Sequence, residues 1–180
     1  SFSGTAPDGA IYGLAQQADG RLVVIGDFST LCGQPRQSLG RLTANGLLDA
    51  GFTAVVNGGL RAVAMQPDGK ILIGGSFTQL SGQAQTNIAR LNANGSLDST
   101  FKPLANNWVL ALALQSDGKI LLGGLFTTLN GQPCQGIGRL NADGTLDADF
   151  HPQPNAPILS IQLQADGKIL VGGTFTTIGG

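Results

Sequence analysis

Residues 66–77 read QPDGKILIGGSF, a stretch that joins a tight turn to an apolar run ending at two glycines. In the Pro-Asp-Gly turn, proline suits the second position of a type I turn, and glycine supplies the positive φ of a three-residue hairpin loop. The apolar run after the turn is typical of a buried strand. The stretch therefore predicts a β-hairpin that pairs Gln66 with Lys70, Met65 with Ile71, and Val63 with Ile73.

The same pattern recurs along the chain at an interval of 49 residues. The Asp-Gly turn begins at Asp19, Asp68, Asp117 and Asp166. The phenylalanine that closes the pattern recurs at Phe28, Phe77, Phe126 and Phe175, and another opens the units at Phe2, Phe52, Phe101 and Phe150. We interpret residues 1–180 as a single repeat array with units of about 2–51, 52–100 and 101–149 and an incomplete unit 150–180.

Each complete unit predicts four short antiparallel strands. In the second unit these are strand a (60–66), strand b (70–77), strand c (87–92) and a short strand d (96–101). A polar loop rich in Gly, Gln and Thr joins strands b and c. The predicted hydrophobic spine consists of the four closing phenylalanines with Val63, Ile73, Leu112 and Leu122.

Both faces of each a–b hairpin are apolar. In the third unit one face is predicted to carry Leu110, Leu112, Leu114, Ile120 and Leu122, and the other Ala111, Ala113, Leu121 and Gly123. A sheet with two apolar faces has to be covered on both sides, so we expect the large-residue face of one unit to pack on the small-residue face of the next. Four-stranded sheets stacked at this period predict an all-β fold, a β-propeller of which the chain covers about three and a half blades.

Composition excludes several classes of protein. Only 12% of residues are charged, glutamate is absent, 28 residues are glycine and the net charge is -1. Few residues favour exposed helices, no basic field is present for nucleic acid, and no apolar run approaches the roughly 18 residues of a membrane span.

Residues 97–144 read LDSTFKPLANNWVLALALQSDGKILLGGLFTTLNGQPCQGIGRLNADG. The combination of a DGKI-x-x-GG-x-F hairpin with an RLN-x-DG turn resembles the delta-60 repeats of bacterial surface and secreted proteins. The resemblance implies a propeller domain of unknown function, an extracellular or cell-surface prokaryotic location, and no catalytic residues to carry over. The first unit departs from the pattern, since Ile25 replaces the first glycine of the pair.

One arginine and one aspartate, eight residues apart around the c–d turn, recur in every complete unit. The turn register predicts that they face each other as Arg41–Asp49, Arg90–Asp98 and Arg139–Asp147, with Gly95 and Gly144 at positive φ. They form either cross-strand ion pairs or a charged binding ring, and their presence in each unit favours the structural interpretation.

A few further residues have side chains that could bind a ligand. Residues 141–149 have the oxygen spacing of a calcium loop but lack its closing glutamate, so a turn is favoured and a weak site at Asp143 and Asp147 stays open. Asp147, Asp149 and the sole histidine, His151, alternate along one face of the predicted strand and could present two carboxylates and an imidazole to a metal, but only this unit has them. Tyr12 and Trp108 either pack between blades or stack on a sugar.

The two cysteines, Cys32 and Cys134, are either unpaired thiols or joined to a part of the protein outside this sequence. We predict no catalytic, cofactor or metal residues, and therefore no enzyme. The expected function is a structural or surface-display module; the alternative is a propeller that recognises glycans or a partner protein through its b–c loops. The expected partners are further blades of the same chain or another copy, contacting Leu159, Ile161 and Ile169, with no nucleic acid and no membrane insertion.

Overall fold

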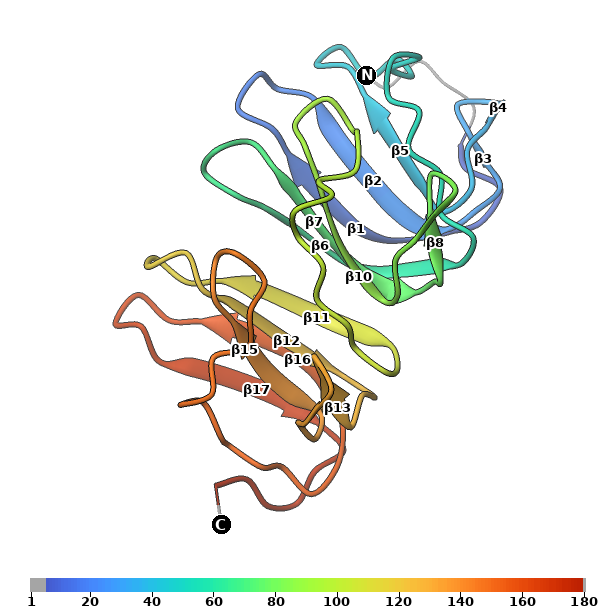
Figure 1. Ribbon diagram of the computed structural model, residues 1–180. Coiled ribbons are helices and arrows are strands. Elements are labelled where there is room, and N and C mark those ends of the chain that lie inside the picture. Colours follow the sequence, from blue (N-terminus) through green and yellow to red (C-terminus); the bar gives the residue numbers. More distant parts are fainter. Residues whose placement is uncertain (1–5, 180) are drawn as a thin grey trace.

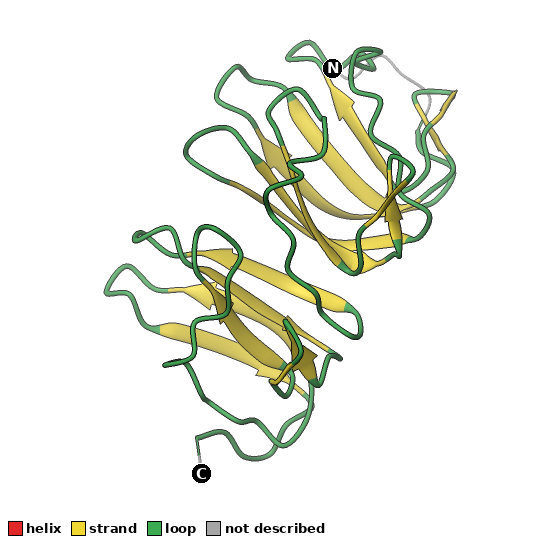
Figure 2. Ribbon diagram, viewed as in Figure 1, coloured by secondary structure: helices red, strands yellow, loops and turns green. Residues whose placement is uncertain are grey.

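The computed structural model describes residues 6–179, and all regular secondary structure within them is β-strand (Figure 2). The strands form small antiparallel sheets that follow one another in chain order as a stack (Figure 1). Phe2, the predicted start of the first unit, lies outside the described residues. No helix in this range has the length and apolar character needed to cross a membrane. The all-β architecture expected from the repeat is confirmed.

The first three units each form one three-stranded sheet, here called a blade, with strand b in the middle. The first blade contains β1 (Ala10–Gln16), β2 (Leu22–Asp27) and β5 (Leu39–Leu42). The second contains β6 (Gly59–Met65), β7 (Ile71–Ser76) and β10 (Ile88–Leu91). The third contains β11 (Val109–Leu114), β12 (Ile120–Gly124) and β15 (Ile137–Leu140). The fourth consists of β16 (Ile158–Leu163) and β17 (Ile169–Gly173).

The hairpin register predicted from the Pro-Asp-Gly turn is confirmed. Val63 pairs with Ile73 and Met65 with Ile71. The Gln66 N–H donates to the Lys70 carbonyl at 2.8 Å, and the turn glycine has a φ of 83°. Local turn chemistry is therefore sufficient to set the pairing of strands a and b.

A bulge in every strand a changes one of the predicted faces. In the third blade the register shifts between Val109 and Ala111, which leaves Leu110 as the extra residue. Val109 consequently takes the place on the large-residue face that was predicted for Leu110. The same irregularity occurs in the other three blades, because each strand a has one more residue than strand b can pair.

The blades pack as predicted, with the small-residue face of one against the large-residue face of the next. A methyl group added at Gly74 would lie 2.6 Å from Val109 of the third blade, and one at Gly123 would lie 2.9 Å from Ile158 of the fourth. Glycine therefore allows the sheets to approach closely enough for these large side chains to be fully buried.

Strand d is much shorter than predicted. In the second blade it is reduced to a single bridge between Leu91 and Leu97, with equivalent bridges in the first and third blades. The reason is Asp98, whose carboxylate accepts the Thr100 N–H at 3.1 Å while its carbonyl accepts the Phe101 N–H at 3.2 Å. These bonds turn the chain away from the sheet, so the fourth strand ends after one pair.

The b–c loops contain a small hairpin that the sequence analysis missed. The paired segments are β3 (Thr30–Leu31) with β4 (Gln34–Pro35), β8 (Gln79–Leu80) with β9 (Gln83–Ala84), and β13 (Thr128–Leu129) with β14 (Gln132–Pro133). Both turn residues have positive φ, for example 52° at Asn130 and 76° at Gly131, as a type I′ turn requires. A glycine at the second turn position, repeated every 49 residues, was the available signal.

The side chains of the predicted spine are not all buried to the same degree. Phe28, Phe77 and Phe126 are buried as predicted, with Leu122 and Ile73, whereas Val63 and Leu112 are partly buried against the same clusters. Phe175 in the fourth blade is half-buried. In each of the first three blades the closing phenylalanine shares a hydrophobic cluster with a leucine of the b–c hairpin and a leucine of strand c, such as Leu80 and Leu91 around Phe77.

The two end faces of the stack are apolar. The first blade exposes its large-residue face, where Ile11 and Leu14 are 45% and 57% exposed. The fourth blade exposes the opposite face, where Leu170 is 52% exposed. The expectation that Ile161 and Ile169 would lie on the uncovered face is wrong. The Ile161 side chain points at Gly123 of the third blade, and Ile169 pairs with Leu163 on that same face of the sheet.

Candidate functional site

The four bulge residues lie at equivalent positions on the inner side of the stack. Strands a of consecutive blades lie next to one another, β1 beside β6, β6 beside β11, and β11 beside β16. Their bulges line a common hollow of about 260 Å³ with side chains that differ from blade to blade, namely Tyr12, Arg61, Leu110 and Leu159. The array thus presents one variable residue per blade on a constant backbone.

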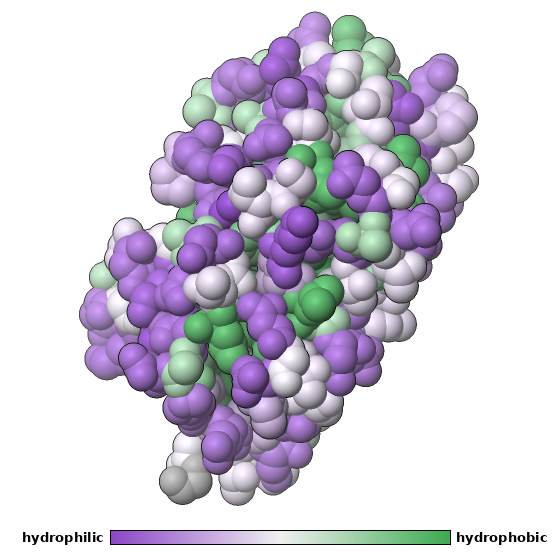
Figure 3. Space-filling view, in the orientation of Figure 1, coloured by the Kyte–Doolittle hydropathy of each residue, from purple (hydrophilic) through white to green (hydrophobic). Residues whose placement is uncertain are grey.

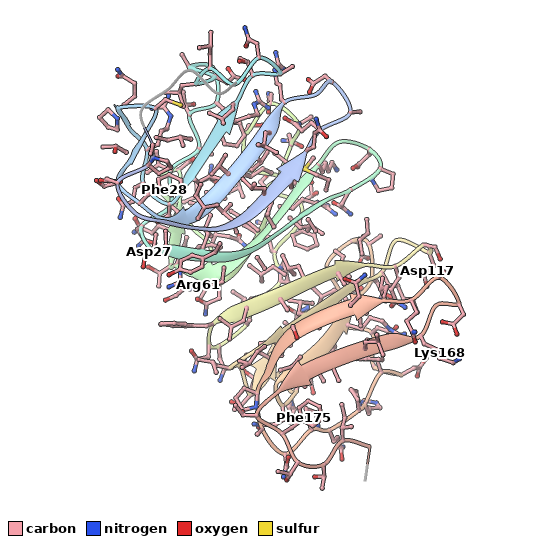
Figure 4. All side chains as sticks on the ribbon, turned by 180° about the vertical axis from the view of Figure 1, so that it is seen from behind. Asp27, Phe28, Arg61, Asp117, Lys168 and Phe175 are labelled. Atoms are coloured by element: carbon pink, nitrogen blue, oxygen red, sulfur yellow. The ribbon has the colours of Figure 1, made fainter. Side chains whose placement is uncertain are left out.

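Arg61 and Tyr12 form the polar part of this hollow. The Arg61 guanidinium lies 4.1 Å from the centre of the Tyr12 ring and 3.6 Å from a carboxylate oxygen of Asp27. Figure 4 shows Asp27 and Arg61 at the same end of neighbouring blades. Arg61 covers one face of the Tyr12 ring, but Tyr12 is 48% exposed, so the ring contacts the second blade without being buried between blades.

Trp108 lies directly before β11, next to the bulge at Leu110. Its side chain is 41% exposed. The structure therefore does not bury Trp108 between blades, and its ring remains accessible at the surface.

The three predicted arginine–aspartate pairs form. Arg41 Nε lies 2.9 Å from Asp49, Arg90 Nε lies 2.9 Å from Asp98, and Arg139 Nε lies 2.7 Å from Asp147. Gly95 and Gly144 have φ values of 95° and 94°, as the turn register requires. The register of the c–d turn is therefore confirmed.

These arginines also connect successive blades, which the sequence analysis did not foresee. Arg90 donates to the carbonyl of Ala142, in the c–d turn of the third blade, at 2.7 Å. Arg41 makes the equivalent bond to Ala93 of the second blade. Each arginine also stacks on the phenylalanine that opens the next unit, at 4.3 to 4.6 Å from the ring centre. The cluster is a tether between blades, and Arg41 and Arg90 are too buried to form a charged binding ring.

The aspartates of the tether are held ionised. The Lys119 ammonium, 2.8 Å away, is the main cause that lowers the pKa of Asp147 to about 2, with Arg139 adding to it. Burial alone would raise the pKa of Asp98, but hydrogen bonds from Thr100, Lys70 and Arg90 outweigh it and lower the pKa. Each carboxylate is therefore charged at neutral pH and is already paired with basic side chains of its own blade.

The residues of the calcium-like segment are engaged in the turn. Asp143 accepts the Thr145 N–H at 2.9 Å and its hydroxyl at 2.7 Å. Asp147 is taken by Arg139 and Lys119, while His151 is exposed. Across residues 6–179, no three His, Cys or Asp side chains come together as a metal site.

A polar cap before strand a recurs in all four blades and was missed. Asn57 accepts the N–H groups of Thr78 and Gln79, both at 2.9 Å, and donates to the Thr78 hydroxyl at 2.8 Å. Equivalent caps are formed by Asp8, Asn106 and Asn155. The 49-residue spacing of these side chains was the available signal. They fix the turn after strand b, so their role is structural.

Neither cysteine is in a disulfide in the described part of the chain. The Cys134 thiol donates to the Ile137 carbonyl at 3.0 Å, and burial raises its pKa to about 11. This thiol is a structural group of the b–c loop, because its thiolate form is strongly disfavoured.

The repeat matches the family model described as "Domain of unknown function (DUF5122) beta-propeller" over residues 17–52, 66–101, 115–150 and 164–180. The chain belongs to this DUF5122 family. The narrower delta-60 name stays a prediction. A search of curated proteins gave no match.

Solved structures show the propeller fold of the DUF5122 chain. The WD40 beta propeller domain of Doa1 aligns with a TM-score of 0.64 at 16% identity, covering 92% of this chain and 48% of that one. The extracellular domain of the putative one component system BT4673 from B. thetaiotaomicron aligns with a TM-score of 0.56 at 17% identity, covering 98% and 22%. The chain thus spans less than half the length of either structure.

Proposed function

We propose that the chain is a non-catalytic structural module, a propeller segment that displays its b–c loops at the surface of a prokaryotic cell or in a secreted protein. The observation that carries this proposal is the blade interface itself. The same apolar packing and the same arginine tether join the first blade to the second and the second to the third. Arg41 and Arg90, each paired with the aspartate of its own c–d turn, hold neighbouring blades together.

The end faces support further blades as partners, from the same polypeptide or from another copy. The large-residue face of the first blade surrounds a hollow of about 220 Å³ lined by apolar side chains, including Ile11, Leu14 and Val24. Ala44, the equivalent of Ala93 and Ala142, accepts no hydrogen bond from residues 6–179. A complete blade would fill the hollow and supply an arginine for this carbonyl.

Light scattering at micromolar concentration tests this proposal. We expect residues 1–180 to associate, and Leu14→Asp to reduce association because a carboxylate on the end face opposes apolar packing. Leu104→Asp is the matched control, since Leu104 is 56% exposed but lies in the linker before β11. A monomer at all concentrations would contradict the role of the end faces.

The extracellular or cell-surface location is also a proposal. It is supported by the delta-60 resemblance and agrees with an extracellular domain among the similar folds. Labelling intact cells of the source organism with an antibody against this chain tests it. Signal only after lysis would contradict a surface location.

The second candidate function is recognition of glycans or a partner protein through the b–c loops. It is favoured by the hairpins in these loops, which present an exposed glutamine at the same place in three blades, Gln34, Gln83 and Gln132. We expect a glycan array to give binding that falls when all three are changed to alanine. An array that gives no binding would contradict a glycan ligand.

A further inference from the structure

A hollow of about 430 Å³ lies beside the b–c loop of the first blade. Its walls are Ser29 and residues 35–37 of that loop and residues 53–55 of the linker to the second blade. Pro35, Ala54 and Val55 form an apolar side, and Ser29, Gln37 and Thr53 provide hydroxyl and amide groups. A hollow of this size, with a few polar groups on an apolar surface, suits a small ligand.

Arg36 gives the hollow a positively charged side chain, whereas the equivalent positions of the next two blades have uncharged residues. In the second blade this position is Gln85, whose amide donates to the Ile88 carbonyl at 2.7 Å. In the third it is Cys134, whose thiol makes the corresponding bond to Ile137. Arg36 does not repeat this loop-closing bond; its Nη1 donates to the carbonyl of Pro35 at 2.7 Å. The side chain thus lines the hollow instead of closing its own loop.

The charge of Arg36 is not neutralised by the chain. The other five arginines each lie within 4 Å of an aspartate, whereas Arg36 has no such partner among residues 6–179. Its buried Nε–H has no acceptor in the same range. Asp8 contacts Ser29 at the edge of the hollow, but its oxygens accept the Ser29 and Thr30 N–H groups and the Ser29 hydroxyl. A guanidinium in a hollow, with no carboxylate partner and a free Nε–H in the described part of the chain, is suited to an incoming anion.

We propose that this hollow binds the carboxylate of an acidic sugar, with Arg36 as the specificity-determining residue. A single positive charge with Asp8 nearby favours a singly charged carboxylate over a doubly charged anion. The hydroxyl and amide groups of Ser29, Gln37 and Thr53 match the hydroxyls of a sugar ring, and Pro35 and Val55 match its apolar edge. The proposal deepens the second candidate function.

Titration of the protein with methyl glucuronide, followed by amide chemical shifts, tests the proposal. We expect shifts at Gln37 and Val55, no comparable shifts with the neutral methyl glucoside, and binding at least tenfold weaker for Arg36→Gln. This variant places at position 36 the residue that the second blade has naturally, so the loop keeps a side chain that the repeat accommodates. Arg61→Gln is the matched control, since it removes an arginine from the separate hollow lined by the four bulge residues and should leave glucuronide binding unchanged.

Three results would overturn the proposal: no glucuronide binding, equal binding of the glucoside, or wild-type affinity in Arg36→Gln. Binding of N-acetylglutamate amide as strong as that of the glucuronide would overturn the sugar assignment in favour of a peptide carboxylate. If the glycan array shows loop-dependent binding and Arg36→Gln leaves that binding unchanged, this site is excluded but the second candidate function stands. If the wild-type protein shows no loop-dependent glycan binding at all, both the site and the second candidate function are excluded.

Discussion

The inner blades and the end blades contain the same kinds of residue in different surroundings. Leu60 of the second blade is fully buried, whereas its equivalent in the first blade, Ile11, is 45% exposed. Leu121 of the third blade is fully buried, and its equivalent in the fourth, Leu170, is 52% exposed. Hairpin register is the same in all of them. Burial in this array is therefore decided by the neighbouring blade and not by the blade to which a residue belongs.

The largest expected effect comes from the spine. We expect Phe77→Ala to lower the free energy of unfolding by about 3–5 kcal/mol, because it leaves a cavity in a fully formed interface. Phe175→Ala should cost clearly less, since Phe175 is half-buried. Urea unfolding of both variants checks the comparison, and equal losses would contradict the difference between inner and end blades.

Loss of the arginine tether is expected to have the second-largest effect on stability. Arg90→Gln should lower the free energy of unfolding by about 1.5–3 kcal/mol, because it removes charged hydrogen bonds to Asp98 and to the Ala142 carbonyl. Arg139 is more exposed and makes no bond to a following c–d turn within residues 6–179, so Arg139→Gln should cost less. Thermal melts of the two variants separate these cases; a larger loss at Arg139 would show that the tether to the next blade adds nothing.

Glycines on the small-residue face give a matched pair of changes. Gly74→Ala should cost about 1–3 kcal/mol, because the added methyl group meets Val109 in a close-packed interface. Gly172→Ala, at the equivalent position of the fourth blade, meets only the Ser160 hydroxyl and should be nearly neutral. Denaturant midpoints of both variants test this, and a neutral Gly74→Ala would mean that the blades can separate without loss.

The smallest expected effect is on pH dependence. The pKa of Asp8 and that of Asp147 are lowered to about 2, so each carboxylate contributes stability above its unfolded pKa near 4 and loses it as the pH falls to 2. Melting temperatures should be flat from pH 7 to about 5 and fall between pH 4 and 2. Asp147→Asn should flatten that fall, and an unchanged slope would contradict the assignment.

Much of the fold could be predicted because its signals are local. The Pro-Asp-Gly and Asn-Gly turns set hairpin register through backbone conformation, and the pairing of Arg90 with Asp98 follows from that register alone. The candidate sites were less predictable. Arg36 differs from Gln85 and Cys134 at one position of a polar loop, and the sequence does not indicate that the two shorter side chains close their loops while the arginine lines a hollow.

By itself the sequence determined the repeat, its period, the two apolar faces and the order in which blades follow one another. Only the tertiary structure decided where the bulge residues point and which carbonyl each tether arginine reaches. The physical reason is the distance along the chain over which each kind of interaction acts. Turn and pairing preferences act over a few residues, whereas the bond from Arg90 to Ala142 spans 52 residues and depends on how closely two sheets pack. The glycines that permit this approach are visible in the sequence, but the side chains that fill the space come from the next blade.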